Sequence, residues 1–258
     1  MSDDYDLDSG PDPASLAASA PEVGVGAGAD ADREPVFAVG IGPGNPEYLT
    51  PRGERAIREV DVVVGFETVV DFVAEAVGAD TEVLTCGYRD EAETLAAFAD
   101  RVADGASGTA VLMGDPNHSG YQFVGKVQAA VDAPVRVIPG VSSLQIAASR
   151  ARTPMEASTF VTLHKSGSID ADLRRLRADA GERHLLVLPR PFDWMPEDVA
   201  GDLLDAGAPP SLDALVFERL THDDESVTRT TLADLAGADV GDGDSRFSDL
   251  SVLVVRAP

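Results

Sequence analysis

Residues 39–50 read VGIGPGNPEYLT. The stretch begins like the end of a β-strand, continues with closely spaced glycines and ends with residues typical of the start of a helix. The glycines are Gly40, Gly42 and Gly44, and Pro43 stands between the last two. Glycine permits positive φ and lets backbone amides approach a ligand, whereas proline stiffens the turn and has no amide hydrogen to donate. Such a turn can hold a small cofactor against bare backbone; the alternative is a purely structural strand-to-helix turn.

Two further turns of this kind occur downstream. Residues 114–116, GDP, follow an apolar run at 109–113, and residues 139–143, PGVSS, follow another at 135–138. In open α/β sheets ligands collect outside the carboxyl ends of the strands. We therefore expect the three turns to converge on one site.

From residue 36 onward, short β-branched runs alternate with helical periodicity, which predicts an α/β fold with mostly parallel strands. Asp90, with Glu93 three residues later, has the spacing of a capping box. The first set of expected strands is 36–41, 61–64, 81–85, 109–113 and 135–138. The expected helices are one from Pro51, then 67–77, 90–103, 121–131 and 142–150.

A second α/β set follows residues 151–156, which break the alternation. Its expected strands are 159–163, 184–188, 212–217, 226–230 and 250–255, with helices from Asp170 and at 196–206. We expect two α/β domains, 35–151 and 152–258, with a cofactor cleft between them. A disordered acidic extension at 1–34 precedes them, and the acidic, glycine-rich stretch 237–248 predicts an exposed excursion.

The composition excludes several classes of protein. A formal charge of −25, from 45 acids and 20 bases, argues against nucleic-acid binding and is typical of a halophile's protein, because concentrated salt screens self-repulsion. The single cysteine, Cys86, cannot form an internal disulfide. No apolar run is long enough to span a membrane, and the N-terminal stretch lacks the features of a signal peptide. We expect a soluble, cytoplasmic protein.

Familiar cofactor motifs are incomplete. Asn45 stands where a dinucleotide fingerprint needs its third glycine, and Val127 stands where a P-loop needs Ser or Thr. The four histidines are scattered singly, so no metal site is expected, and no Gly-x-Ser-x-Gly elbow is present. What remains is a pocket lined by backbone. It suits a cationic cofactor that loses its charge as it reacts, such as a sulfonium methyl donor.

These turns resemble those of the tetrapyrrole (corrin/porphyrin) methyltransferases, and the likeness extends over roughly 36–255. It is carried by GIGPG at 40–44, LT at 49–50, DVVVG at 61–65, PGVSSLQ at 139–145 and FVTLH at 160–164. Within the family these motifs are most similar to the members that methylate C5 of cobalt-precorrin-7 in cobalamin biosynthesis. The resemblance departs at residues 117–120, NHSG, where family members usually carry a small residue and an aromatic.

The resemblance implies S-adenosyl-L-methionine as cofactor, a corrinoid substrate, a homodimer and a separate C15-methyltransferase/decarboxylase as partner. The implied cofactor contacts are Gly40, Gly42, Pro43, Gly44, Gly114, Asp115, Pro116, Ser142, Ser143 and Leu188. The implied catalytic residues are Asp115 and His164. The candidates for binding the carboxylates of the substrate are Arg52, Arg89, Arg150 and Lys165.

Each of these residues also has a structural interpretation. Asp115 can cap the turn before Pro116, Ser142 and Ser143 are good helix N-caps, and single arginines are often solvated surface charges. Two other functions stay open as well: methyl transfer to another corrin carbon, and a non-catalytic module that binds a nucleotide or a tetrapyrrole. Carbon NMR of the product separates the two corrin carbons, and calorimetry with S-adenosylhomocysteine tests the module.

Overall fold

The computed structural model describes residues 34–191, 193–237 and 245–258. The expected N-terminal extension, except Glu34, and most of the expected excursion at 237–248 lie outside the described residues. The chain divides into two compact units between Ser142 and Ser143. Our expected boundary, after Ala151, lies nine residues further along the chain. The division comes before helix α6 (Ser143–Ala151) because this helix buries Leu144 and Ala147 against the second sheet. None of the described helices combines the length and the apolar composition that crossing a membrane requires.

The first unit is built on a sheet of five parallel strands in the order β3-β2-β4-β1-β5. Its β-branched runs form central strands that are buried on both faces, as parallel sheets require. The strands are β1 (Val36–Gly40), β2 (Val62–Phe66), β3 (Glu82–Cys86), β4 (Gly108–Leu112) and β5 (Val135–Ile138). The five predicted strands of this unit are confirmed to within a few residues.

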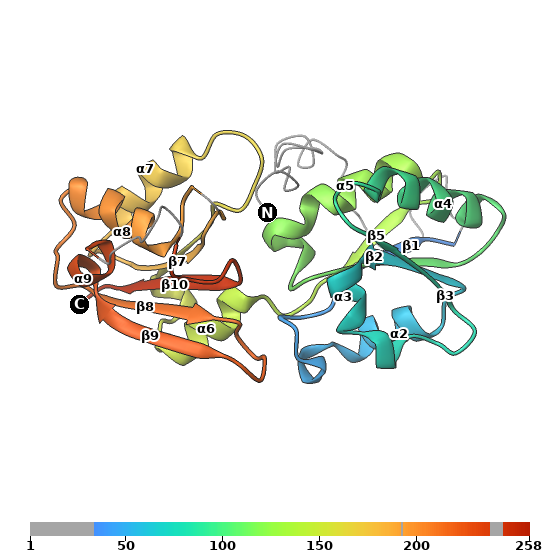
Figure 1. Ribbon diagram of the computed structural model, residues 1–258, viewed down its shortest axis with the longest axis horizontal. Helices are drawn as coiled ribbons and strands as arrows, with labels where there is room; N and C mark the ends of the chain where they lie inside the picture. Colours follow the sequence, from blue (N-terminus) through green and yellow to red (C-terminus); the bar gives the residue numbers. More distant parts are fainter. Residues whose placement is uncertain (1–33, 192, 238–244) are drawn as a thin grey trace. The chain divides into compact units, whose positions relative to one another are not determined.

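Helices cover both faces of this sheet (Figure 1). Helices α4 and α5 pack on the face of Val62 and Ala110, and α2 and α3 pack on the face of Val63 and Val111. The helices are α2 (Pro51–Arg58), α3 (Glu67–Asp71), α4 (Glu91–Ala103) and α5 (Tyr121–Ala130). Short 3-10 turns occur at Pro46–Tyr48 and Ala74–Ala76, and Pro116–Gly120 forms a π-helical turn.

Two local predictions in this unit are wrong. The helix expected at 67–77 ends at Asp71, and Val73, in a segment rich in β-branched residues that disfavour helix, has non-helical φ and ψ of −116° and 12°. The capping box of Asp90 and Glu93 does not form either. Asp90 Oδ1 instead accepts a hydrogen bond from the amide of Gly87, at 2.7 Å, and makes no side-chain cap to α4.

The second unit has a mixed sheet in the order β6-β7-β10-β8-β9. Only β6 and β7 pair in parallel, whereas β10 pairs antiparallel with both β7 and β8, and β8 and β9 form an antiparallel hairpin. The strands are β6 (Ser158–Thr162), β7 (His184–Leu188), β8 (Asp213–Glu218), β9 (Ser226–Thr231) and β10 (Ser251–Arg256). Helices α7 (Asp170–Asp179), α8 (Pro196–Asp205) and α9 (Leu232–Ala236) cover one face, and α6 packs on the other. A 3-10 turn, Met155–Ala157, precedes β6.

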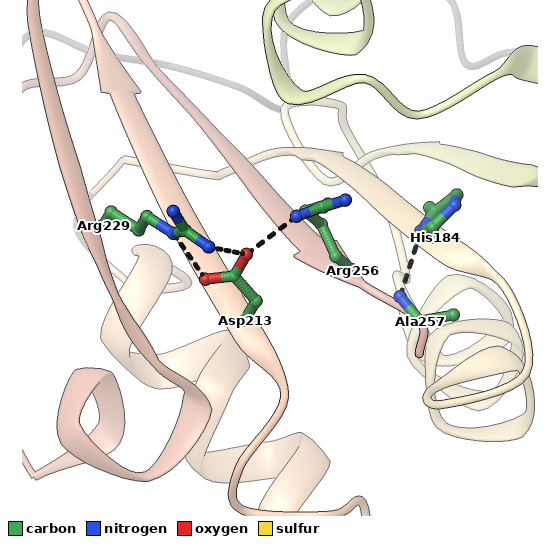
Figure 2. Close-up of polar contacts among 5 residues, drawn as sticks. All are labelled: His184, Asp213, Arg229, Arg256 and Ala257. Atoms are coloured by element: carbon green, nitrogen blue, oxygen red, sulfur yellow. Dashed lines mark hydrogen bonds and ion pairs between the residues drawn. The ribbon is translucent and has the colours of Figure 1, made fainter.

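A polar row crosses the second sheet at the amino end of β7 (Figure 2). Asp213 accepts hydrogen bonds from Arg229, at 2.9 and 3.0 Å, and from Arg256 at 3.0 Å, while His184 Nδ1 accepts from the amide of Ala257 at 3.0 Å. The hydrogen bond from Arg229, with that from Arg256, holds the pKa of Asp213 below its ordinary value. The row ties four strands together at one end of the sheet.

Candidate functional site

The three glycine turns lie on one edge of the first sheet. Because all five strands are parallel, their carboxyl ends share an edge. The turns follow β1, β4 and β5, which are neighbours in the order β4-β1-β5. The fold thus places three stretches that are far apart in the sequence next to one another.

The first two turns are hydrogen-bonded to each other. The amide of Gly42 donates to the carbonyl of Gly114 at 3.2 Å, and the amide of Gly114 donates to the carbonyl of Gly42 at 2.7 Å. Just before them, the amide of Ile41 donates to the carbonyl of Leu112 at 2.9 Å. The turns at 40–44 and 114–116 are therefore held in register by backbone alone.

The third turn packs directly on the other two. A Cβ added at Gly140 would lie 2.2 Å from the carbonyl oxygen of Gly114 and 2.6 Å from that of Gly40, so only glycine fits there. This confirms the predicted convergence of the three turns. Gly140 itself was not among the predicted site residues, although its position directly after a predicted strand and Pro139 was a signal for it.

The backbone at Gly114 has the conformation expected of a ligand cradle. Gly114 has φ +65°, and a Cβ added there would meet no atom within 4 Å, so the backbone lies beside open space. Gly42 has φ +88°, and Tyr48 closes the space beside it. The turns can therefore bring peptide groups against a small molecule without side chains in between.

Asp115 makes the structural contacts that the sequence allowed. Its Oδ1 accepts from the amide of Asn117 at 2.7 Å and from Asn117 Nδ2 at 2.8 Å, which caps the π-helical turn Pro116–Gly120. π-helical turns are rare and often occur at functional sites. Asp115 thus fixes the chain that leaves Gly114, and its predicted contact with a ligand stays a prediction.

The serines of the third turn stand at the start of α6. Ser142 is buried and directly precedes the first helical residue, Ser143, so it occupies the N-cap position. A helix N-terminus favours anionic or polar ligand groups. The cofactor contacts predicted for both serines stay predictions, and so does that of Pro43, which is buried in the first turn.

Two of the predicted carboxylate-binding residues, Arg52 and Arg89, are exposed and follow soon after the carboxyl ends of strands of the first sheet. Arg52 is exposed in the first turn of α2, whose N-cap, Thr50, accepts from the amide of Gly53 at 3.1 Å. Arg89 is exposed in the turn that follows β3. Both side chains are at least partly exposed to solvent.

In the second unit, His164, Lys165 and Leu188 lie at the carboxyl ends of β6 and β7. Thr162 pairs with Leu188, and the amide of Leu163 donates to the carbonyl of Leu188 at 2.9 Å. Burial lowers the pKa of His164 to about 4, so its imidazole is neutral at pH 7. It cannot bind a carboxylate there as a cation.

The two other predicted cations are already ion-paired within the second unit. Lys165 Nζ lies 2.5 Å from Asp172 Oδ2. Arg150, near the end of α6, pairs with Glu225, which also accepts from the amide of Thr221 at 2.7 Å. Each would have to exchange its partner to bind a substrate carboxylate, and no sequence pattern had indicated these pairs.

The chemistry that this edge offers is that of backbone amides and carbonyls. Among residues 34–191, 193–237 and 245–258, no three His, Cys, Asp or Glu side chains gather as metal ligands. Preorganised peptide groups bind and orient a polar small molecule at little entropic cost.

Comparison with known proteins gives one family. The model of the Tetrapyrrole (Corrin/Porphyrin) Methylases matches residues 35–236. A probable cobalt-precorrin-7 C(5)-methyltransferase of Methanocaldococcus jannaschii is 27% identical over 220 residues, which are 85% of this chain and 96% of that protein. A cobalt-precorrin-4 C(11)-methyltransferase of Priestia megaterium is 25% identical and covers 79% of this chain and 81% of its own.

A solved structure has the same fold. The uroporphyrin-III C-methyltransferase of Thermus thermophilus, crystallised with S-adenosylhomocysteine, superposes with a TM-score of 0.64 at 23% identity, over 86% of this chain and 92% of that one. The prediction of two α/β units is confirmed by this likeness.

Proposed function

The chain belongs to the tetrapyrrole (corrin/porphyrin) methylase family, and on this premise we propose that it transfers a methyl group from S-adenosylmethionine to C5 of cobalt-precorrin-7. The observation that carries the proposal is the contact of three glycine turns at the carboxyl ends of β4, β1 and β5. The C5 position follows the similarity to the Methanocaldococcus jannaschii protein.

The glycine turns fit the family's cofactor, because the open space beside Gly114 is one that a Cβ would fill. We assign cofactor binding to the turns at 40–44, 114–116 and 139–143. When bound, S-adenosylmethionine supplies a methyl group on a positively charged sulfur. Peptide carbonyls tolerate this cation without a fixed counter-charge that would oppose the loss of charge in the transition state.

The role of the protein in this reaction is mainly positioning. The hydrogen bonds between Gly42 and Gly114 fix the two turns, and the cap that Asp115 makes fixes the chain beyond them. We propose that neutral His164 is a proton acceptor or a hydrogen-bond donor toward the substrate, because its lowered pKa leaves the ring uncharged. Leu188 stays a proposed contact of the cofactor.

Carboxylate recognition is assigned to Arg52 and Arg89, whose side chains are exposed. Guanidinium groups bind carboxylates in bidentate fashion, and precorrins carry many acetate and propionate groups. Arg52→Ala and Arg89→Ala should each raise the KM for the corrinoid several-fold and leave the affinity for S-adenosylhomocysteine unchanged. The matched control is Arg174→Ala, which removes an exposed arginine from α7.

The test of the function has two arms in multimolar potassium chloride. Calorimetry measures the binding of S-adenosylhomocysteine, and transfer of a labelled methyl group to cobalt-precorrin-7 is followed by carbon NMR of the product. Tight cofactor binding with a new methyl at C5 supports the proposal. A methyl at another carbon overturns the C5 assignment, and absence of cofactor binding overturns methyl transfer altogether.

Methylation at another corrin carbon is the second candidate. The similarity to the Priestia megaterium protein, a cobalt-precorrin-4 C(11)-methyltransferase, favours it. The same NMR experiment with cobalt-precorrin-4 as substrate separates the two. The homodimer and the separate C15 partner stay predictions, which sedimentation and co-purification would test.

A further inference from the structure

Aromatic residues lie at or just beyond the ends of two strands of the first sheet, where glycines lie at or just beyond the ends of the neighbouring strands. Phe66 is the last residue of β2, and Tyr88 lies two residues beyond the last residue of β3, Cys86. The ring centroids of Phe66 and Tyr88 are 4.9 Å apart with the planes tilted by 50°. Behind them, Phe66 contacts Phe123 of α5 with the centroids 5.4 Å apart.

These rings lie on the same edge as the glycine turns. In the order β3-β2-β4-β1-β5, the strand that carries Phe66 is hydrogen-bonded to β4, the strand that Gly114 follows. Neighbouring strands are about 4.8 Å apart, so β3 and β4 are separated by about 10 Å. One edge therefore has a glycine part, over β4, β1 and β5, and an aromatic part, over β3 and β2.

Tyr88 is unusual in its exposure. It is 50% exposed and is the only aromatic residue among the exposed large hydrophobic side chains of the described residues. Its partner Phe66 is half-buried and packs in turn on the buried Phe123, so the Tyr88 ring is anchored from one side and stays half exposed. A half-exposed aromatic ring anchored in this way suits a flat conjugated ligand.

We propose that Tyr88, backed by Phe66, is the surface on which the conjugated ring of the tetrapyrrole substrate stacks. The identity of the ligand rests on the proposed function. Arg89, the next residue, is exposed in the same turn and can bind a carboxylate at the rim of the stacked ring. Stacking on Tyr88, next to the glycine part of the edge, would bring the tetrapyrrole ring close to the methyl donor proposed there. Tyr88 is then a determinant of substrate binding rather than of cofactor binding.

The test uses four proteins: wild type, Tyr88→Ala, Tyr88→Phe and the control Val83→Ala. Val83 is 43% exposed and lies near the amino end of β3, the strand that Tyr88 follows. Methyl transfer to cobalt-precorrin-7 gives KM and kcat, an optical titration with uroporphyrin III gives tetrapyrrole affinity, and calorimetry gives the affinity for S-adenosylhomocysteine.

We expect Tyr88→Ala to weaken corrinoid and porphyrin binding about tenfold, as loss of an aromatic stack does, with the cofactor affinity unchanged. Tyr88→Phe and Val83→Ala should stay within about twofold of wild type. If the wild type binds tetrapyrroles and Tyr88→Ala binds them equally well, the stacking proposal is overturned. If wild type binds uroporphyrin III but methylates no corrinoid, the proposed function fails, and the porphyrin titration alone decides the role of Tyr88. Failure of wild type to bind either tetrapyrrole overturns both.

Discussion

The substitution Gly140→Ala tests the contact of the three glycine turns most directly. The added Cβ would lie 2.2 Å from the carbonyl oxygen of Gly114 and 2.6 Å from that of Gly40. Ordinary carbon contacts need roughly 3.5 Å, so the third turn must move by about 1 Å. The Gly114 oxygen cannot simply yield, because it accepts the hydrogen bond of the Gly42 amide.

Overpacking of a rigid site costs about 1–3 kcal/mol, and we expect the upper end, about 3 kcal/mol of unfolding free energy. Gly140 is not among the glycines with positive φ, so the steric effect acts alone. Chemical unfolding followed by circular dichroism in multimolar potassium chloride measures the stability. Calorimetry should show that the affinity for S-adenosylhomocysteine falls at least tenfold, because the displaced turn carries proposed cofactor contacts.

Gly114→Ala is the matched comparison. Its Cβ meets no atom within 4 Å, but its φ of +65° disfavours alanine by about 1 kcal/mol. We expect a small loss of stability with a clear loss of cofactor affinity, because the new methyl occupies the open space beside the backbone. The reasoning is refuted if Gly140→Ala unfolds within 1 kcal/mol of wild type, or if it costs less than Gly114→Ala.

Three other outcomes are expected. Gly201→Ala in α8 should raise the unfolding free energy by about 0.5–1 kcal/mol, since the added Cβ meets no atom; a lower melting temperature would contradict this. The pKa of His164 is about 4 in the folded protein and about 6.5 in the unfolded chain, so the unfolded chain binds a proton first as the pH drops. The unfolding free energy should therefore fall between pH 6.5 and pH 4, by up to about 3 kcal/mol, and His164→Asn should make it less dependent on pH. Asp213→Ala should lower the unfolding free energy by about 1 kcal/mol, because it removes the hydrogen-bond acceptor of Arg229 and Arg256, and should leave the cofactor affinity unchanged. Equal melting temperatures of variant and wild type would show that the polar row does not contribute to stability.

The sequence predicted the strands well because their apolar runs are short, β-branched and bounded by turn residues. It also predicted that the turns at 40–44, 114–116 and 139–143 meet, since parallel strands bring their carboxyl ends to one edge. It could not show that β4, β1 and β5 are neighbours, because strand order depends on long-range packing. The sequence could place Gly140 in a turn after a strand, but its contact with Gly114 depends on that strand order and could not be predicted.

Other failures came from competition between local contacts. Asp90 had the spacing of a capping box, but its carboxylate satisfies the Gly87 amide in the preceding turn instead. Lys165 and Arg150 were predicted from their charge alone, whereas Asp172 and Glu225 are their partners in the structure. In a chain with 45 acids, finding a carboxylate near a cation is the rule, and sequence spacing does not say which one.

The ion pair of Lys165, together with a second one made by Lys126, makes the chain suitable for chemical labelling. Lys126, paired with Glu91, belongs to the first unit, and Lys165, paired with Asp172, belongs to the second. Their side chains are only 22% and 17% exposed, and the sequence has no other lysine. An amine-reactive reagent, read by peptide mass spectrometry, would therefore report the local opening of each unit through one lysine adduct in a separate peptide.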